Sequence, residues 1–141
     1  MATAHTTAEA TAREAMRRWI SGARGGDWSG LVEMLHPEVI FHVPVEGFAG
    51  PRHGVAEARR FFDHLAVAVR AHLAVTAVLT DGQRFGFEVA VAGLWLDRPF
   101  RQGLCLVFVP AGDVVKEFGE YLAWPGGLDP QTVHFGENRL G

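Results

Sequence analysis

The sequence has little cysteine, no cluster of positive charge and no long apolar segment. Cys105 is the only cysteine among 141 residues, which excludes an internal disulfide and favours a reducing cytoplasm. The formal net charge is -3 and the basic residues form no long run, so we expect no nucleic-acid partner. No apolar run reaches the length of a membrane span, and residues 1–12 lack the apolar region of a signal peptide.

What the sequence does have is enough apolar material for one folded domain. Hydrophobic residues make up 48% of the chain, which is sufficient for a real core at this length. We therefore predict a single domain over residues 1–141, with its core at about 8–124 and a mostly polar tail at 125–141.

Three helices are predicted in the first half. Thr6 and Glu9 have the spacing of a capping box, and Gly25-Gly26 ends the first helix. Its apolar face recurs at helical spacing: Ala12, Met16, Trp19, Ile20 and Ala23.

A second, short helix follows Asp27, with apolar residues up to Pro37. A strand is then predicted over 39–45, a loop rich in glycine and proline over 46–54, and a third helix over 55–69.

The second half is predicted as a meander of four strands, at 73–79, 85–96, 100–109 and 114–123. The connecting turns are Asp81-Gly82, Asp97-Arg98-Pro99 and Pro110-Ala111-Gly112-Asp113. Because these connections are too short for parallel crossovers, the pairing is expected to be antiparallel.

The strand at 85–96 is apolar on both faces. One face carries Phe85, Phe87, Val89, Val91 and Trp95, and the other carries Ala90, Ala92, Leu94 and Leu96. Helices cover one face of such a sheet, so the other requires a partner. We predict a homodimer through the outer face; aggregation of the isolated domain is the alternative consequence.

The order of elements and two local motifs resemble the SnoaL-like proteins of the nuclear transport factor 2-like superfamily. The motifs are His36–Pro44 followed by Gly54 and Phe61-Phe62, and Gly112–Val115 leading to Tyr121. The resemblance implies an α+β, cone-like roll, in which three N-terminal helices pack on a strongly curved, mostly antiparallel sheet in the order α-α-β-α-β-β-β-β.

The superfamily hosts isomerases, cyclases, dehydratases, epoxide hydrolases and non-catalytic proteins, so the fold alone does not select a function. Ketosteroid isomerases have acidic residues where this chain has Val43 and Cys105, and a tyrosine where it has Trp19, which excludes their machinery. SnoaL-type cyclases place an acidic residue directly before an aromatic one on the last strand, and Glu120-Tyr121 fits that pattern. The histidine that those cyclases carry on the preceding strand maps to Cys105.

Glu120 is the leading catalytic candidate. It alternates with Phe118 and Leu122, so on an inward face it becomes a carboxylate in an apolar cup with a raised pKa. The competing interpretation is a solvated surface glutamate. If the strand faces the other way, Glu117 and Tyr121 line the pocket instead.

Three further residues are catalytic candidates. Arg101 could hold a carboxylate or enolate oxygen, or extend into solvent. His42 could relay a proton, or serve as an interface histidine. Tyr121 could orient the substrate or stabilise developing charge.

An apolar, largely aromatic set is predicted to bind the substrate, with filling of the core as the alternative role. The set is Trp19, Phe41, Val43, Phe61, Phe62, Phe87, Val89, Cys105, Phe118 and Leu122. The histidines lack the spacing of metal ligands, and the family needs no metal, so we expect neither a metal nor another cofactor.

The leading hypothesis is a SnoaL-like enzyme of bacterial secondary metabolism. It would carry out cofactor-free cyclisation or isomerisation of a hydrophobic, polyketide-like substrate by general acid/base catalysis. The alternatives are an epoxide hydrolase or epoxide-opening cyclase in the same pocket, and a non-catalytic ligand-binding or scaffold protein.

Overall fold

A six-stranded sheet forms the body of the protein. The computed structural model describes residues 6–124 and Leu140. The strands are β1 (Leu35–His42), β2 (Arg52–His53), β3 (Val69–Thr80), β4 (Phe85–Trp95), β5 (Arg98–Ala111) and β6 (Val114–Trp124). They lie in the order β2-β1-β6-β5-β4-β3, and every neighbouring pair is antiparallel except β1 with β6. The predicted antiparallel meander is confirmed.

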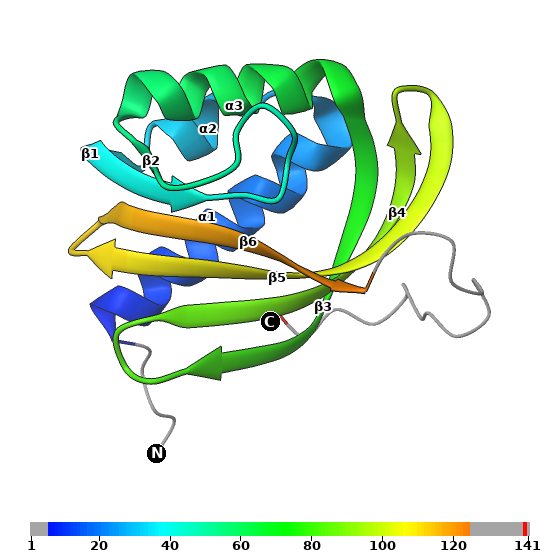
Figure 1. Ribbon diagram of the computed structural model, residues 1–141. Helices are drawn as coiled ribbons and strands as arrows, with labels where there is room; N and C mark the ends of the chain where they lie inside the picture. Colours follow the sequence, from blue (N-terminus) through cyan, green and yellow to red (C-terminus); the bar gives the residue numbers. More distant parts are fainter. Residues whose placement is uncertain (1–5, 125–139, 141) are drawn as a thin grey trace.

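Three helices lie over one face of the curled sheet (Figure 1). They are α1 (Thr7–Gly25), α2 (Ser29–Val32) and α3 (Val55–Ala68). The Glu9 amide donates to Thr6 Oγ1 at 3.0 Å, and α1 ends at Gly26, whose φ of 82° is left-handed. The predicted α+β class, with helices on a curved and mostly antiparallel sheet, is thereby confirmed.

The first strand differs from its prediction. It begins at Leu35 rather than at residue 39, and the second helix is only four residues long. The pairing of β1 with β6 sets this earlier start, because the Val115 amide of β6 donates to the Met34 carbonyl at 2.7 Å. Pro37, which has no amide to donate, lies in the irregular part of that register.

The segment predicted as a loop at 46–54 contains the two-residue strand β2, which pairs with Ile40 and Phe41. A strand of two residues is too short to show an alternating pattern in the sequence, so only its pairing with β1 reveals it. Of the predicted tail, only Leu140 is among the described residues. It is buried, and its carbonyl accepts a hydrogen bond from the Arg13 guanidinium. Within the described part of the chain, no helix is long and apolar enough to cross a membrane.

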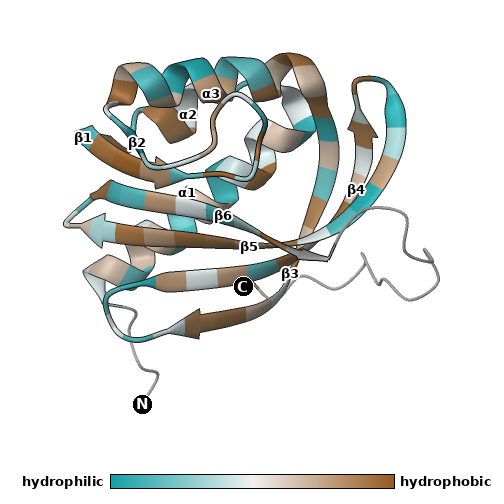
Figure 2. Cartoon of the chain, viewed as in Figure 1, coloured by the Kyte–Doolittle hydropathy of each residue, from teal (hydrophilic) through white to brown (hydrophobic). Residues whose placement is uncertain are grey.

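The core under the helices is aromatic. Trp19 on α1 lies edge-on to four rings, with centroids 5.5 Å from Trp28, 5.4 Å from Phe62, 6.0 Å from Phe108 and 5.8 Å from Phe118. Figure 2 shows mainly apolar positions along β5 and alternating apolar and polar positions along α3. The apolar positions of α3 point down into this cluster, since Ala58, Phe61, Phe62 and Leu65 are all buried.

The outer face of the sheet carries apolar side chains that this chain does not cover. Ile40, Leu79, Leu94 and Tyr121 are between 41% and 56% exposed. On β4 the outward side chains include the small, buried Ala90 and the charged, exposed Glu88. The homodimer through this face therefore stays a prediction.

The turn between β4 and β5 is tighter than predicted. Trp95 pairs with Arg98, so the loop is Leu96-Asp97 and Arg98 already belongs to β5. Both loop residues have positive φ, 50° and 65°, which costs a residue with a side chain about 1 kcal/mol. The Leu96 amide ties the hairpin to α3 by donating to the Ala68 carbonyl at 2.8 Å.

The strain in this loop predicts a gain in stability. Replacing Leu96 by Asn and Asp97 by Gly, the pair that such loops prefer, is expected to raise the free energy of unfolding by about 1 kcal/mol in urea denaturation. Gly112→Ala is the reciprocal control. Gly112 has φ 63° and open space around an added Cβ, so alanine is expected to lower the free energy of unfolding by about 1 kcal/mol. A Leu96/Asp97 variant that is no more stable than the wild type would contradict the strain.

Candidate active site

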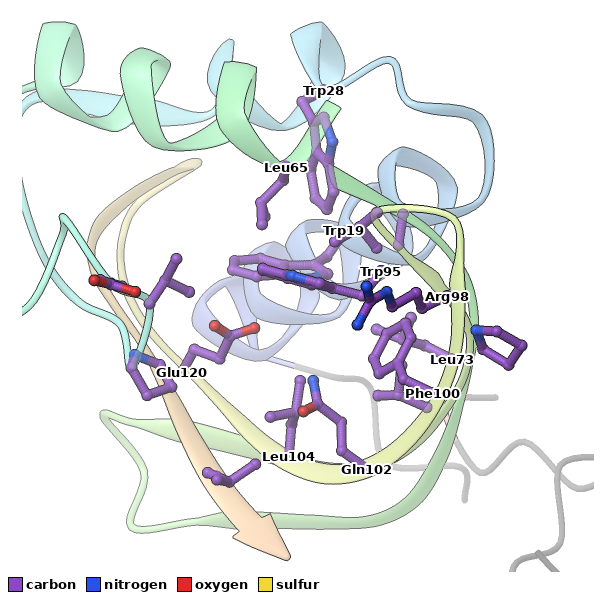
Figure 3. Close-up of a pocket in the computed structure, with 18 residues that line it drawn as sticks. Trp19, Trp28, Leu65, Leu73, Trp95, Arg98, Phe100, Gln102, Leu104 and Glu120 are labelled. Atoms are coloured by element: carbon purple, nitrogen blue, oxygen red, sulfur yellow. The ribbon is translucent and has the colours of Figure 1, made fainter. Parts of the chain in front are cut away.

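A cavity of about 420 Å³ lies between the helices and the curled ends of β3 to β6 (Figure 3). Its volume is in the range of small-molecule sites. Its apolar walls are built from Trp19, Ala23, Trp28, Pro44, Val45, Leu65, Val69, Leu73, Val91, Trp95, Pro99, Phe100, Leu104 and Leu122.

A cluster of phenylalanine rings packs beside the cavity, at the other end of the sheet. Phe41 stacks on Phe118 at 4.9 Å, and Phe61 and Phe62 close over them from α3. Beyond Trp19 the sheet contributes Leu73, Val91 and Leu104 to the cavity wall, together with the rings of Trp95 and Phe100. Trp19 thus separates a packed half of the core from a hollow one.

Glu120 places a carboxyl group in this hollow. On β6, Phe118, Glu120 and Leu122 are every second residue, so their side chains lie on the same face of the strand. Leu122 also lines the cavity. Burial raises the pKa of Glu120 to about 7. No hydrogen bond or ion pair joins its side chain to the residues that the structure describes. At neutral pH the carboxyl is therefore about half protonated and can both accept and donate a proton.

Three more polar side chains line the cavity: Glu46 from the segment after β1, and Arg98 and Gln102 from β5. In Figure 3 the ends of Arg98, Gln102 and Glu120 point into the cavity from different walls. Arg98 and Gln102 were not among the site residues predicted from the sequence. Alternation with Leu104 and Leu106 on β5 was the signal that could have found Gln102.

Of the predicted substrate-binding set, Trp19 and Leu122 line the cavity. The others, apart from Cys105, are buried in the packed core and do not line it: Phe41, Val43, Phe61, Phe62, Phe87, Val89 and Phe118. For these seven residues, the alternative role that the sequence left open, filling the core, matches their position.

The remaining candidates lie on the opposite face of the sheet. His42, Cys105 and Tyr121 line a hollow on the outer face, and Arg101 lies between Phe100 and Gln102, which both line the cavity. His42 Nε2 is 3.9 Å from Glu117 Oε1. Burial, together with the charge of Glu88, raises the pKa of the Cys105 thiol. The sheet therefore separates these residues from Glu120, and the catalytic roles predicted for His42, Arg101 and Tyr121 stay predictions.

No group of three or more histidine, cysteine, aspartate or glutamate side chains in the described residues could hold a metal ion. Among the described residues, the charged and amide side chains that line the cavity carry two carboxyls, one guanidinium and one amide, beside the indole N–H groups of three tryptophans. This set suits proton transfer and hydrogen bonding to a substrate oxygen.

Glu120 makes the stability depend on pH in a defined direction. Its pKa rises from 4.5 to about 7, so the folded chain binds the proton more tightly than the unfolded chain. The tighter binding of this proton stabilises the folded chain. This contribution to the free energy of unfolding is fully present below about pH 4.5 and is lost as the pH rises through 7. Glu120→Gln removes this dependence.

The free energy of unfolding of Glu120→Gln, minus that of the wild type, is therefore expected to grow by about 2 kcal/mol between about pH 5 and pH 8. Urea denaturation across this range measures the difference, and groups that titrate equally in both proteins cancel. A difference that stays constant with pH would show that the carboxyl is not desolvated.

The fold has many relatives among solved structures. An NTF2-like protein from Anabaena variabilis superposes with a TM-score of 0.82 at 22% identity, covering 89% of this chain and 97% of that one. A candidate SnoaL-like polyketide cyclase from a Jannaschia species gives a TM-score of 0.68 at 15% identity, covering 86% and 92%.

An epoxide hydrolase/cyclase-like enzyme with a role in pyran ring formation in the polyether salinomycin gives a TM-score of 0.67 at 15% identity, covering 84% of this chain and 95% of that one. At such identities the three structures show a shared fold. No curated protein matches the sequence. Residues 16–116, however, match the model of the SnoaL-like domain. The chain therefore belongs to the family of SnoaL-like domains.

Proposed function

We propose that this protein is an enzyme that moves a proton on a hydrophobic, carbonyl-bearing substrate in the cavity. The reaction is a cofactor-free cyclisation or isomerisation of a polyketide-like molecule, with Glu120 as general acid and base. One observation carries the proposal: a carboxyl group with a pKa of about 7 faces an open, mainly apolar cavity.

The proposed chemistry uses Glu120 twice. As a carboxylate it removes a proton from the carbon next to a substrate carbonyl, which leaves an enolate. The enolate carbon then attacks a second carbonyl of the same molecule, forming the ring bond. The protonated Glu120 returns its proton to the resulting alkoxide, or to a different carbon in an isomerisation, so the protein ends unchanged. The apolar walls contribute by folding the substrate so that its reacting carbons meet.

The family and its structural relatives support this choice of chemistry. One relative is named as a candidate polyketide cyclase, and another acts in ring formation of a polyether. A homodimer through the exposed apolar outer face and a place in bacterial secondary metabolism belong to the same proposal.

Opening of an epoxide is the second candidate, and Glu46 favours it. This reaction needs one acid to protonate the epoxide oxygen and one base for the attacking hydroxyl. Glu46 and Glu120 line the same cavity, so the chain can supply both. Cleavage of the carbon–oxygen bond and formation of the new one then leave a diol, or a cyclic ether and an alcohol.

A binding protein without catalysis is the outcome to be distinguished. The aromatic side chains that line the cavity leave space for a ligand. This favours a ligand-binding protein over a scaffold that binds no small molecule. A protein of this kind would bind apolar ligands and turn over none of them.

Glu120→Gln is expected to lower kcat on an accepted polyketide-like substrate by about 10²- to 10⁴-fold, because the amide cannot exchange a proton. Glu117→Gln is the matched control on the same strand and the opposite face, and its kcat is expected to stay unchanged. Turnover of the Glu120 variant at the wild-type rate, with an intact fold, would refute the proposed role.

The two candidate reactions differ in their dependence on Glu46. Epoxide opening is expected to lose at least about tenfold in kcat in Glu46→Gln, while cyclisation or isomerisation by Glu120 alone is expected to be nearly unaffected. Assays on an apolar epoxide and on a cyclisation substrate, run with both single variants, assign the reaction. Epoxide turnover retained in Glu46→Gln would refute the role of Glu46, and a wild type that opens no epoxide would exclude the second candidate.

A further inference from the structure

The cavity contains hydrogen-bond donors that no described protein group satisfies. Arg98 and Gln102 both line the cavity, and Figure 3 shows the guanidinium and the amide pointing into it. Neither side chain makes a hydrogen bond or an ion pair with the residues that the structure describes. A guanidinium and an amide together offer seven N–H groups, so this part of the cavity can donate several hydrogen bonds to a ligand.

The position of Arg98 is set by a rigid hairpin end. Its backbone is the cross-strand partner of Trp95, directly next to the strained Leu96-Asp97 loop. The Trp95 ring packs against two other rings, with its centroid 6.1 Å from that of His64 and 6.3 Å from that of Phe100. Strained loops persist where the surrounding structure holds them, and they gather at ligand-binding sites. The hairpin therefore holds the base of the Arg98 side chain at the cavity wall.

In Figure 3 the Arg98 guanidinium and the Glu120 carboxyl lie at opposite sides of the cavity. Arg98 is exposed, while Glu120 is partly buried on β6. A ligand that spans the cavity thus meets the guanidinium at one end and the acid/base at the other, within walls that include Trp19, Leu73 and Leu104. A carboxylate matches the planar fork of a guanidinium with two parallel hydrogen bonds.

We propose that the cavity takes hydrophobic substrates that carry a carboxylate, and that Arg98, with Gln102, is the residue that selects them. This rests on the proposed function, since it names the substrate class of the same cavity. The carboxylate sits at the Arg98 wall, and its two oxygens accept from the guanidinium and the Gln102 amide. The reacting carbon then lies toward Glu120.

The competing occupant is a cationic ligand. Aromatic rings and carboxylates attract an ammonium group, and Trp19, Trp95 and Glu46 line the cavity as well. Such a ligand would have to lie beside the Arg98 charge and would leave its donors without an acceptor. The test therefore includes a cationic probe.

Three unreactive probes of one shape decide between these occupants: 2-naphthoate, 2-naphthamide and 2-naphthylmethylammonium. Their dissociation constants are measured by isothermal titration calorimetry at about pH 6, where most of Glu120 carries its proton. The wild type is expected to bind the carboxylate about tenfold more tightly than the amide, and the ammonium most weakly.

Arg98→Gln is expected to reduce the preference for the carboxylate over the amide to about one, with amide binding unchanged. Amide binding serves as the internal check that the cavity is intact. Arg84→Gln, which removes an exposed arginine from the β3–β4 hairpin, is the matched control and is expected to keep the preference. If Arg98→Gln does not bind the amide, Arg98→Lys carries the test: a several-fold smaller preference supports the proposal and an unchanged one overturns it.

A wild type that prefers the amide or the ammonium, or an Arg98→Gln variant that keeps the preference, overturns this proposal. Neither result bears on the proposed proton transfer by Glu120, because the probes do not react. Conversely, a Glu120→Gln variant with full turnover refutes the proposed function while the preference for carboxylates remains measurable. The two failures are thereby distinguishable.

Discussion

Trp19, in the middle of α1, packs edge-on against Trp28, Phe62, Phe108 and Phe118. Each such aromatic pair adds about 0.5–1.5 kcal/mol beyond the burial of its area, so the ring is held from the helices and the sheet at once. Its other side faces the cavity. The same indole therefore fixes α1 on the sheet and forms the boundary at which close packing stops.

The chemistry of the cavity follows from this boundary. On β6, Phe118 lies in the packed ring cluster, and Glu120, two residues later on the same face, lies in the hollow. The carboxyl thus leaves water without gaining a hydrogen-bond partner among the described residues, and desolvation alone raises its pKa to about 7. The strained β4–β5 hairpin brings Arg98 to another wall of the same space. The cavity thus combines the Trp19 ring with an acid and a cation, Glu120 and Arg98, that have no side-chain partner among the described residues.

Much of this was predictable from local pattern. The capping residues of α1, the meander and the inward alternation of Phe118, Glu120 and Leu122 depend on periods and turn residues that the sequence displays. The start of β1 at Leu35 and the strand β2 were not predictable, because partner strands impose them. The large rings were candidates for both core and pocket, and only their packing around Trp19 separates the two roles. Arg98 was expected in a turn; the two-residue loop moves it into β5 and onto the cavity.

The central claim is that Glu120 titrates near neutrality because the cavity desolvates it. Carbon-13 NMR of glutamate-labelled protein, with the Glu120 carboxyl resonance assigned by its absence from Glu120→Gln, measures this pKa directly. The account predicts a midpoint of about 7. A midpoint near the 4.5 of a free glutamate would show a solvated carboxylate, and neither the proposed proton transfer nor the character of the cavity would stand.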